Sequence, residues 1–123
     1  MATPHSALVR AVLDLLRLRG ILAFQINTGA VTIGGRYVRF GARGLPDVLA
    51  VLPAHSAGGP AGGWAYHPAG RLLTLEVKTG AGRLTADQRA ARDNLRAAGA
   101  LVWEVRDLGE LDALLREVLA VTA

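Results

Sequence analysis

Apolar residues at helical spacing mark both ends of the chain. The first segment follows Thr3-Pro4, a pair typical of a helix start, and runs to Gly20, where the helix is expected to end. Its apolar positions are Leu8, Val12, Leu15 and Leu16. The last segment follows a second capping pattern, Asp107 with Glu110, and its apolar positions are Leu111, Leu114, Leu115, Val118 and Leu119. The chain is therefore predicted to begin and end with amphipathic helices.

Shorter apolar segments between these helices are typical of β-strands. Residues 21–26 predict one strand, and residues 31–33 and 36–40 predict a hairpin whose turn contains two glycines. Residues 48–52 are continuously apolar, as in a strand buried on both faces. Because such strands usually lie in the middle of a sheet, we expect residues 48–52 to be central.

A second central strand is predicted for residues 71–79, where side chains alternate between two faces. Its apolar face is expected to contain Leu73, Leu75 and Val77. Glu76 and Lys78 share the opposite face, so this polar pair points to one place.

A loop, a helix and a strand account for the remaining segments. Residues 53–70 are rich in Pro, Gly, Ala and Ser, which predicts a long loop. Thr85 and Gln88 form a capping-box pattern that begins a helix ending at Gly99. Residues 100–105 predict a further strand.

The composition is that of one globular domain. The 123 residues are 51% hydrophobic, enough for one core and too few for two, and we expect Phe24 and Trp103 in that core. The net charge of +4 is consistent with an anionic partner. The absence of cysteine excludes disulfides, thiolate zinc sites and cysteine nucleophiles. No apolar segment approaches the roughly 20 residues that span a bilayer, so we expect a soluble, cytoplasmic protein without a membrane partner.

Two acids in the buried strands are candidates for binding a metal ion. Asp47 directly precedes the strand at residues 48–52, and Glu76 lies in the next strand. If these strands are neighbours, the two carboxylates converge at one edge of the sheet. Mg²⁺ and Mn²⁺ prefer carboxylate and carbonyl oxygen, and the backbone carbonyl of Val77 could supply a further ligand.

Lys78 is the only lysine among the 14 basic residues. Beside a bound cation, an ammonium group could orient a water molecule or stabilise developing negative charge, a task that a planar guanidinium suits poorly. The alternative is an ordinary ion pair between Glu76 and Lys78, worth less than about 1 kcal/mol if exposed. The Glu-x-Lys pattern alone does not separate these interpretations.

Longer segments resemble a known nuclease family. Residues 40–49 (FGARGLPDVL), 73–78 (LTLEVK) and 82–88 (GRLTADQ), with residues 27–30 (NTGA), resemble the VRR-NUC branch of the PD-(D/E)XK superfamily. The resemblance implies a single nuclease domain over residues 1–123. It also implies an α/β fold with a restriction endonuclease-like core, a central mixed sheet flanked by helices, in the order α-β-β-β-β-α-β-α.

The same resemblance implies roles for individual residues. Asp47 and Glu76 match the metal-binding acids of the family, Lys78 its catalytic lysine, and Gln88 a glutamine that assists the site. It implies an Mg²⁺- or Mn²⁺-dependent deoxyribonuclease, an endonuclease of branched DNA such as Holliday junctions, which acts as a homodimer and is encoded by a bacterium or phage. Gln88 has an alternative role as the capping partner of Thr85.

One position departs from the family pattern. Members carry an acid near the start of the first helix, and here His5 occupies that neighbourhood. Three explanations stay open: two acids suffice, His5 or a water molecule substitutes, or metal binding is weaker. The departure motivates a second interpretation, a catalytically weak or inactive DNA-binding or assembly module that retains the nuclease fold. An RNA nuclease is a third.

Arginines are the candidate contacts to DNA. Arg36, Arg39 and Arg43 lie in a glycine-rich stretch shortly before the first acid, where flexible backbone and positive charge suit a phosphate backbone. Arg83 and Arg89 lie before and within the next predicted helix. The alternative for Arg89 is a solvated helix face without DNA contact.

Overall fold

Three helices and six strands lie in the part of the chain that the computed structural model describes, residues 3–26, 29–40, 44–53 and 70–119. In chain order they are α1 (Pro4–Leu18), β1 (Leu22–Gln25), β2 (Gly29–Ile33), β3 (Arg36–Phe40), β4 (Val48–Leu52), β5 (Arg71–Val77), α2 (Ala86–Ala97), β6 (Leu101–Val105) and α3 (Leu108–Leu119). Five strands precede α2, one more than in the expected order, because the hairpin contributes both β2 and β3.

Four strands form a mixed sheet in the order β1-β4-β5-β6. β4 is antiparallel to β1 and β5, whereas β6 runs parallel to β5 because the chain crosses over through α2. The two buried strands are therefore neighbours in the centre of the sheet, as expected. Antiparallel pairing places the start of β4 beside the end of β5, and the first residue of β4, Val48, lies opposite Leu75.

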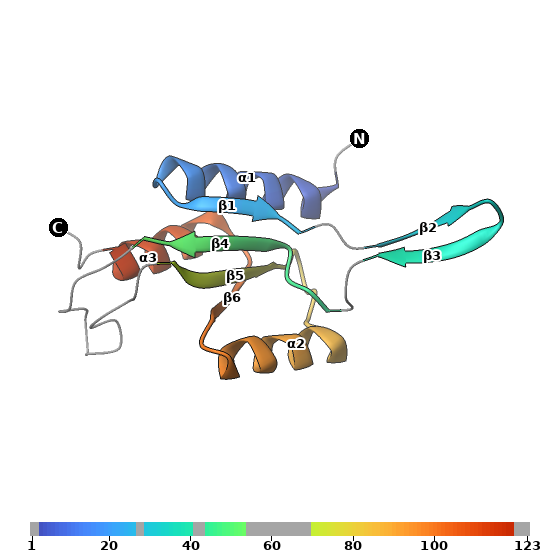
Figure 1. Cartoon of the computed structure of the whole chain (residues 1–123). Helices are drawn as coiled ribbons and strands as arrows, with labels where there is room; N and C mark the ends of the chain where they lie inside the picture. The colour runs from blue at the N-terminus through green and yellow to red at the C-terminus, as the bar shows by residue number, and fades with distance from the viewer. Residues whose placement is uncertain (1–2, 27–28, 41–43, 54–69, 120–123) are drawn as a thin grey trace.

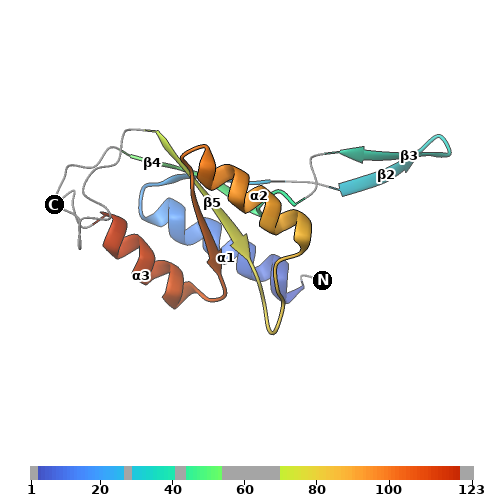
Figure 2. The ribbon, with the colours of Figure 1, turned by 90° about the horizontal axis from the view of Figure 1, so that it is seen from below.

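Helices cover both faces of the sheet. α1 and α3 lie on one face and α2 on the other (Figure 1). The core fills the space between the sheet and the α1–α3 layer, where Leu16, Leu75, Val77, Leu111 and Leu115 have no exposed surface. α2 contributes no fully buried residue and packs against β6. The view from below shows α2 crossing the sheet on this side (Figure 2).

Incomplete cover by α2 explains two wrong expectations. Leu49 and Val51 on β4 are only half-buried, so this strand is fully buried on one face and not on both. Phe24 on the edge strand β1 is 52% exposed, although a core position was expected, and its neighbour Ala23 takes the buried side. Trp103 on β6 is buried, as expected.

The helix signals are confirmed to within a residue or two. Thr3 caps α1 by accepting a hydrogen bond from the Ser6 backbone, and Gly20 lies just beyond the helix end. The buried positions of α1 are Val9, Val12, Leu13 and Leu16, so Leu8 and Leu15 lie beside the centre of the buried stripe. Asp107 caps α3 by accepting from the Glu110 backbone at 2.8 Å. Among the described residues, no helix is long and apolar enough to cross a membrane.

The predicted hairpin is confirmed as a separate two-stranded sheet. β2 and β3 pair in antiparallel register from Gly29 opposite Phe40 to Ile33 opposite Arg36. Gly34 and Gly35 form its turn with φ values of 57° and 78°, in the left-handed region that favours glycine. Both views show the hairpin extending away from the four-stranded sheet (Figures 1 and 2).

Gly44 lies in the segment that leads into β4, and its backbone packs closely against the start of α2. Its φ is +77°, and a methyl group added there would overlap the backbone carbonyl of Asp87. We expect Gly44→Ala to lower the free energy of unfolding by about 3 kcal/mol in urea denaturation. Gly20→Ala is the matched control, because Gly20 has the same φ with open space around it, and should cost only about 1 kcal/mol. Equal losses in the two variants would contradict a packing role for Gly44.

Candidate active site

Asp47 and Glu76 meet at the edge of the sheet where β4 begins and β5 ends. The Asp47 backbone N–H donates to the Leu75 carbonyl at 3.1 Å, which extends the β4–β5 pairing by one residue. Its side-chain Oδ2 accepts from the Val77 N–H at 2.7 Å. These contacts hold Asp47 beside the end of β5, so the two acids converge as the strand pattern predicted.

Glu76 is a carboxyl group in a poor environment for negative charge. It is 5% exposed, and burial raises its pKa from 4.5 to about 8. The neighbouring charge of Asp47 adds to the rise and that of Glu104 adds slightly, while Lys78 opposes them. Two acids that disfavour each other's ionisation at one place form a site that a cation would stabilise.

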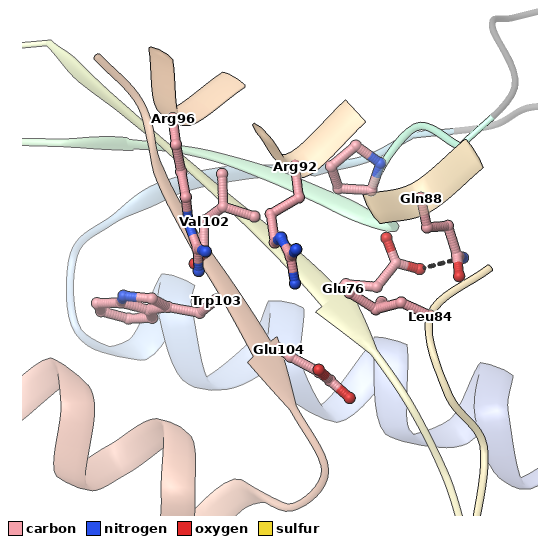
Figure 3. A pocket seen from close by; sticks show the side chains of 9 residues that line it. Glu76, Leu84, Gln88, Arg92, Arg96, Val102, Trp103 and Glu104 are labelled. Carbon is pink, nitrogen blue, oxygen red and sulfur yellow. Dashed lines mark hydrogen bonds between the residues drawn. The ribbon is translucent and has the colours of Figure 1, made fainter. Parts of the chain in front are cut away.

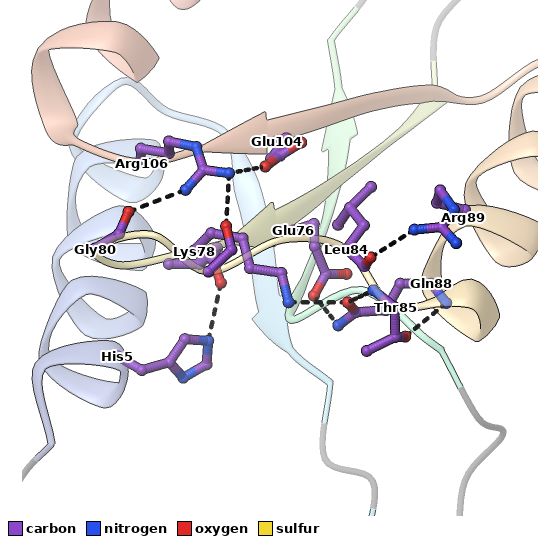
Figure 4. A network of polar contacts seen from close by, with 12 residues as sticks. His5, Glu76, Lys78, Gly80, Leu84, Thr85, Gln88, Arg89, Glu104 and Arg106 are labelled. Atoms are coloured by element: carbon purple, nitrogen blue, oxygen red, sulfur yellow. Dashed lines mark hydrogen bonds and ion pairs between the residues drawn. The ribbon is translucent and has the colours of Figure 1, made fainter.

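Gln88 connects the second acid to the lysine. Its Nε2 donates to Glu76 Oε1 at 2.6 Å, and its Oε1 accepts from Lys78 Nζ at 2.8 Å (Figure 4). The same Oε1 accepts from the Thr85 N–H at 2.9 Å, and the Gln88 N–H donates to Thr85 Oγ1 at 3.1 Å. The two roles considered for Gln88 are therefore compatible, because the capping box that starts α2 also aims this side chain at the acid and the lysine.

His5 lies against the same sheet edge from the first turn of α1. Its Nε2 donates to a backbone carbonyl, that of Val77, at 3.0 Å (Figure 4). The same Nε2 lies 3.5 Å from Asp47 Oδ1. The first turn of α1 thus brings residue 5 to the edge where Asp47 and Glu76 meet.

The donor set fits a hard divalent cation. Asp47 and Glu76 supply carboxylate oxygens, and the Val77 carbonyl faces the same edge. Within the described residues, no three His, Cys, Asp or Glu side chains gather closely enough to hold a metal ion. Two carboxylates and a carbonyl nevertheless suit Mg²⁺ or Mn²⁺, which keep several water ligands in protein sites.

The raised pKa of Glu76 predicts how stability depends on pH in metal-free protein. The folded state holds a proton on Glu76 up to about pH 8, whereas the unfolded state releases it near 4.5. Stability should therefore fall as the pH rises between these values, on the order of 2 kcal/mol from pH 5 to 8. Urea unfolding in EDTA measures this, and Glu76→Gln should flatten the curve. An equally steep curve in that variant would show that other groups cause the slope.

The predicted DNA-binding arginines have varied surroundings. Arg36 is exposed beside the hairpin turn, and Arg83 is exposed just before α2. Arg89 donates through Nη1 to the Leu84 carbonyl at 2.8 Å, so it also ties the start of α2. The Arg39 side chain and Arg43 lie outside the described residues.

A small cavity adjoins Glu76 on the α2 side of the sheet, and the sequence did not predict it. Glu76 and Gln88 lie at one end, with Arg92, Arg96 and Glu104 along its walls (Figure 3). Its volume is about 40 Å³, which is room for one water molecule. Glu104 lies directly opposite Glu76 across the β5–β6 pairing. Glu104 is the only charged residue within β6, and this was a sequence signal that could have identified the position.

Comparisons with known proteins agree with the fold. No family model matches the sequence, and no curated protein matches it. A solved structure described as "VRR_NUC domain" matches with a TM-score of 0.59 and 21% sequence identity, over 94% of this chain and 97% of that chain. The predicted α/β, restriction endonuclease-like fold of a VRR_NUC domain is therefore confirmed.

Proposed function

We propose that this protein is a metal-dependent nuclease that hydrolyses phosphodiester bonds in DNA. The observation that carries the proposal is the chain of contacts from Asp47 and Glu76 through Gln88 to Lys78. It joins a paired-carboxylate site to the only lysine of the chain at one sheet edge. The fold shared with a VRR_NUC domain supports the same assignment.

Asp47, Glu76 and the Val77 carbonyl would hold Mg²⁺ or Mn²⁺. When bound, the ion would neutralise charge on the scissile phosphate and make a water molecule more acidic. Val77 N–H anchors one oxygen of Asp47, which leaves its other oxygen toward His5 and the site. Gln88 similarly holds one oxygen of Glu76. Both acids are thus oriented by contacts that do not involve the ion.

Lys78 would act on the phosphate or on the attacking water. Gln88 accepts one of its three ammonium hydrogens at 2.8 Å, which restrains a flexible side chain and leaves the other donors available. A restrained donor beside developing negative charge stabilises it without reorganisation at the moment of reaction. We assign Lys78 this catalytic role and Gln88 the orientation of both Glu76 and Lys78.

The substrate we propose is DNA, with branched forms such as Holliday junctions preferred, cleaved by a homodimer. Two sites related by a two-fold axis would suit a four-way junction. Arg36 and Arg83 are exposed, and with Arg39, Arg43 and Arg89 they are the proposed phosphate contacts.

Cleavage assays with defined substrates test the proposal. Junction and duplex DNA should be cut with Mg²⁺ or Mn²⁺ and should stay intact with EDTA, and a matched RNA should be cut more slowly. Asp47→Asn controls for contaminating nuclease. Preferential cleavage of RNA would reassign the substrate, and absence of metal-stimulated cleavage on every substrate would remove the nuclease assignment.

The second candidate is a DNA-binding or assembly module with little catalysis. It is favoured by His5 standing where the resemblance expects an acid. Calorimetric titration with Mn²⁺ separates the two candidates, because the nuclease should bind the ion at or below millimolar concentration. DNA binding without any ion binding would favour the module.

A further inference from the structure

Arg106, the residue that follows β6, reaches the loop that connects the two halves of the candidate site. This loop, residues 78–84, runs from the end of β5 to the capping residue of α2, and we name it the β5–α2 loop. Arg106 Nη1 donates to the Gly80 carbonyl at 3.3 Å, and Nη2 donates to the Gly82 carbonyl at 2.7 Å (Figure 4). Nη2 also contacts Glu104 Oε1 at 2.6 Å. One guanidinium thus ties two points of the loop to β6.

Within the described part of the chain, the other backbone contact in the middle of the β5–α2 loop is made by the loop itself. Gly80 has a φ of +56°, and Gly82 donates to the Thr79 carbonyl at 3.1 Å within the loop itself. Glycine-rich backbone samples many conformations unless outside contacts restrain it. Lys78 begins the loop, and Gln88 lies one helical turn beyond its end. The conformation of the loop therefore sets how the lysine meets its glutamine partner.

We infer that Arg106 is a positioning residue that holds the β5–α2 loop so that Lys78 and Gln88 meet. The expected effect of Arg106 on the cleavage rate rests on the proposed nuclease function. Its expected effect on the Lys78–Gln88 contact rests on the geometry alone. The backbone of Lys78 is already fixed by its N–H, which donates to the Val105 carbonyl at 3.0 Å. Arg106 extends this attachment to β6 from the start of the loop into its middle.

Arginine suits this task because its planar group carries five N–H donors. Two carbonyls and one carboxylate accept from it together, which a lysine ammonium on a flexible stem cannot reproduce in the same geometry. Glu104 orients the guanidinium from two residues earlier on β6. Both side chains are more than a third exposed, so their ion pair adds little to stability. The role assigned to Arg106 is therefore to position the loop.

The kinetic test compares Arg106→Ala and Arg106→Lys with the wild-type protein. Both variants should lower the single-turnover rate of DNA cleavage by about 10- to 100-fold, with the dissociation constant for DNA in Ca²⁺ changed by less than about twofold. Arg106→Lys keeps the positive charge but loses the planar group that bonds both loop carbonyls, so its cleavage rate should resemble that of Arg106→Ala. Arg116→Ala is the matched control, because Arg116 pairs with Asp112 on its own helix, α3.

The spectroscopic test uses the fact that Lys78 is the only lysine. Protein labelled with ¹⁵N-lysine has a single side-chain ammonium, whose signal reports on the hydrogen bond to Gln88. Arg106→Ala and Arg106→Lys should both shift this signal or broaden it by faster exchange with solvent, and Arg116→Ala should not. The measurement needs neither metal nor DNA, so it decides the structural role even if the wild-type protein cleaves nothing.

Three results would overturn the inference. An unchanged Lys78 signal in both Arg106 variants would show that the loop does not need this residue. Wild-type behaviour of Arg106→Lys in both tests would show that charge alone suffices. Weaker DNA binding with an unchanged cleavage rate would make Arg106 a DNA contact.

Discussion

Glu76→Gln is expected to lower the rate of DNA cleavage by about a thousandfold or more. The substitution keeps the size of a side chain that is only 5% exposed, so the β5 edge should stay packed. It removes one of the two carboxylates that would bind the ion, and leaves Asp47 as the other proposed acidic ligand. The rate is measured under single-turnover conditions with junction DNA and saturating Mg²⁺.

A control substitution of an acid on another element distinguishes loss of a metal ligand from loss of one negative charge. Glu117→Gln removes the same charge near the end of α3 and should cleave at the wild-type rate. Calorimetric titration with Mn²⁺ should show weakened binding for Glu76→Gln and unchanged binding for Glu117→Gln. Full cleavage and full ion binding by Glu76→Gln would exclude Glu76 as a metal ligand.

The parts of the fold that the sequence predicted depend on local signals or on neighbouring strands. Thr85 with Gln88 is a local pattern, and the structure contains the capping box that it predicts. Alternation along the predicted strand, residues 71–79, separates Leu75 from Glu76, although β5 ends at Val77 and Lys78 lies just beyond it. The pairing of consecutive strands then brings Asp47 to the same edge. Two acids and the lysine could therefore be placed together without knowledge of the tertiary structure.

The parts that the sequence did not predict depend on contacts between distant segments. His5 and Val77 are 72 residues apart in the sequence, and no local pattern indicates that they meet. Phe24 has an ordinary strand pattern, but it lies on the edge strand β1, whereas α2 packs against β6 at the other edge, and it is exposed. Arg106 likewise looks like any surface arginine until its contacts with Gly80 and Gly82 are seen.

Backbone contacts also explain part of the preference for arginine over lysine. Arg17 donates to the Ala23 carbonyl at 3.1 Å and Arg96 to the Val102 carbonyl at 2.9 Å, as Arg89 and Arg106 do elsewhere. A guanidinium can bond a carbonyl and still carry its charge to the surface. The only lysine instead donates to the side chain of Gln88, inside the candidate site. This difference in surroundings leads to the last prediction.

Lys78→Arg is expected to lower the cleavage rate by at least about a hundredfold, with DNA affinity changed by less than about twofold. The positive charge is kept, so attraction for the phosphate backbone remains. A planar guanidinium cannot take the position of an Nζ that lies 2.8 Å from Gln88 Oε1 without moving the glutamine that also contacts Glu76. The loss should therefore be in the rate of the chemical step, measured by single-turnover cleavage beside DNA binding in Ca²⁺.

Chemical rescue distinguishes the ammonium itself from the charge that it carries. Lys78→Ala leaves space where a small amine can bind, so added methylamine should restore part of its activity, whereas Lys78→Arg should not respond because the guanidinium fills that space. Arg116 pairs with Asp112 on α3, so Arg116→Ala should cleave at the wild-type rate with or without methylamine. Near wild-type cleavage by Lys78→Arg would show that any cation serves at this position, and Lys78 would then have no role specific to lysine.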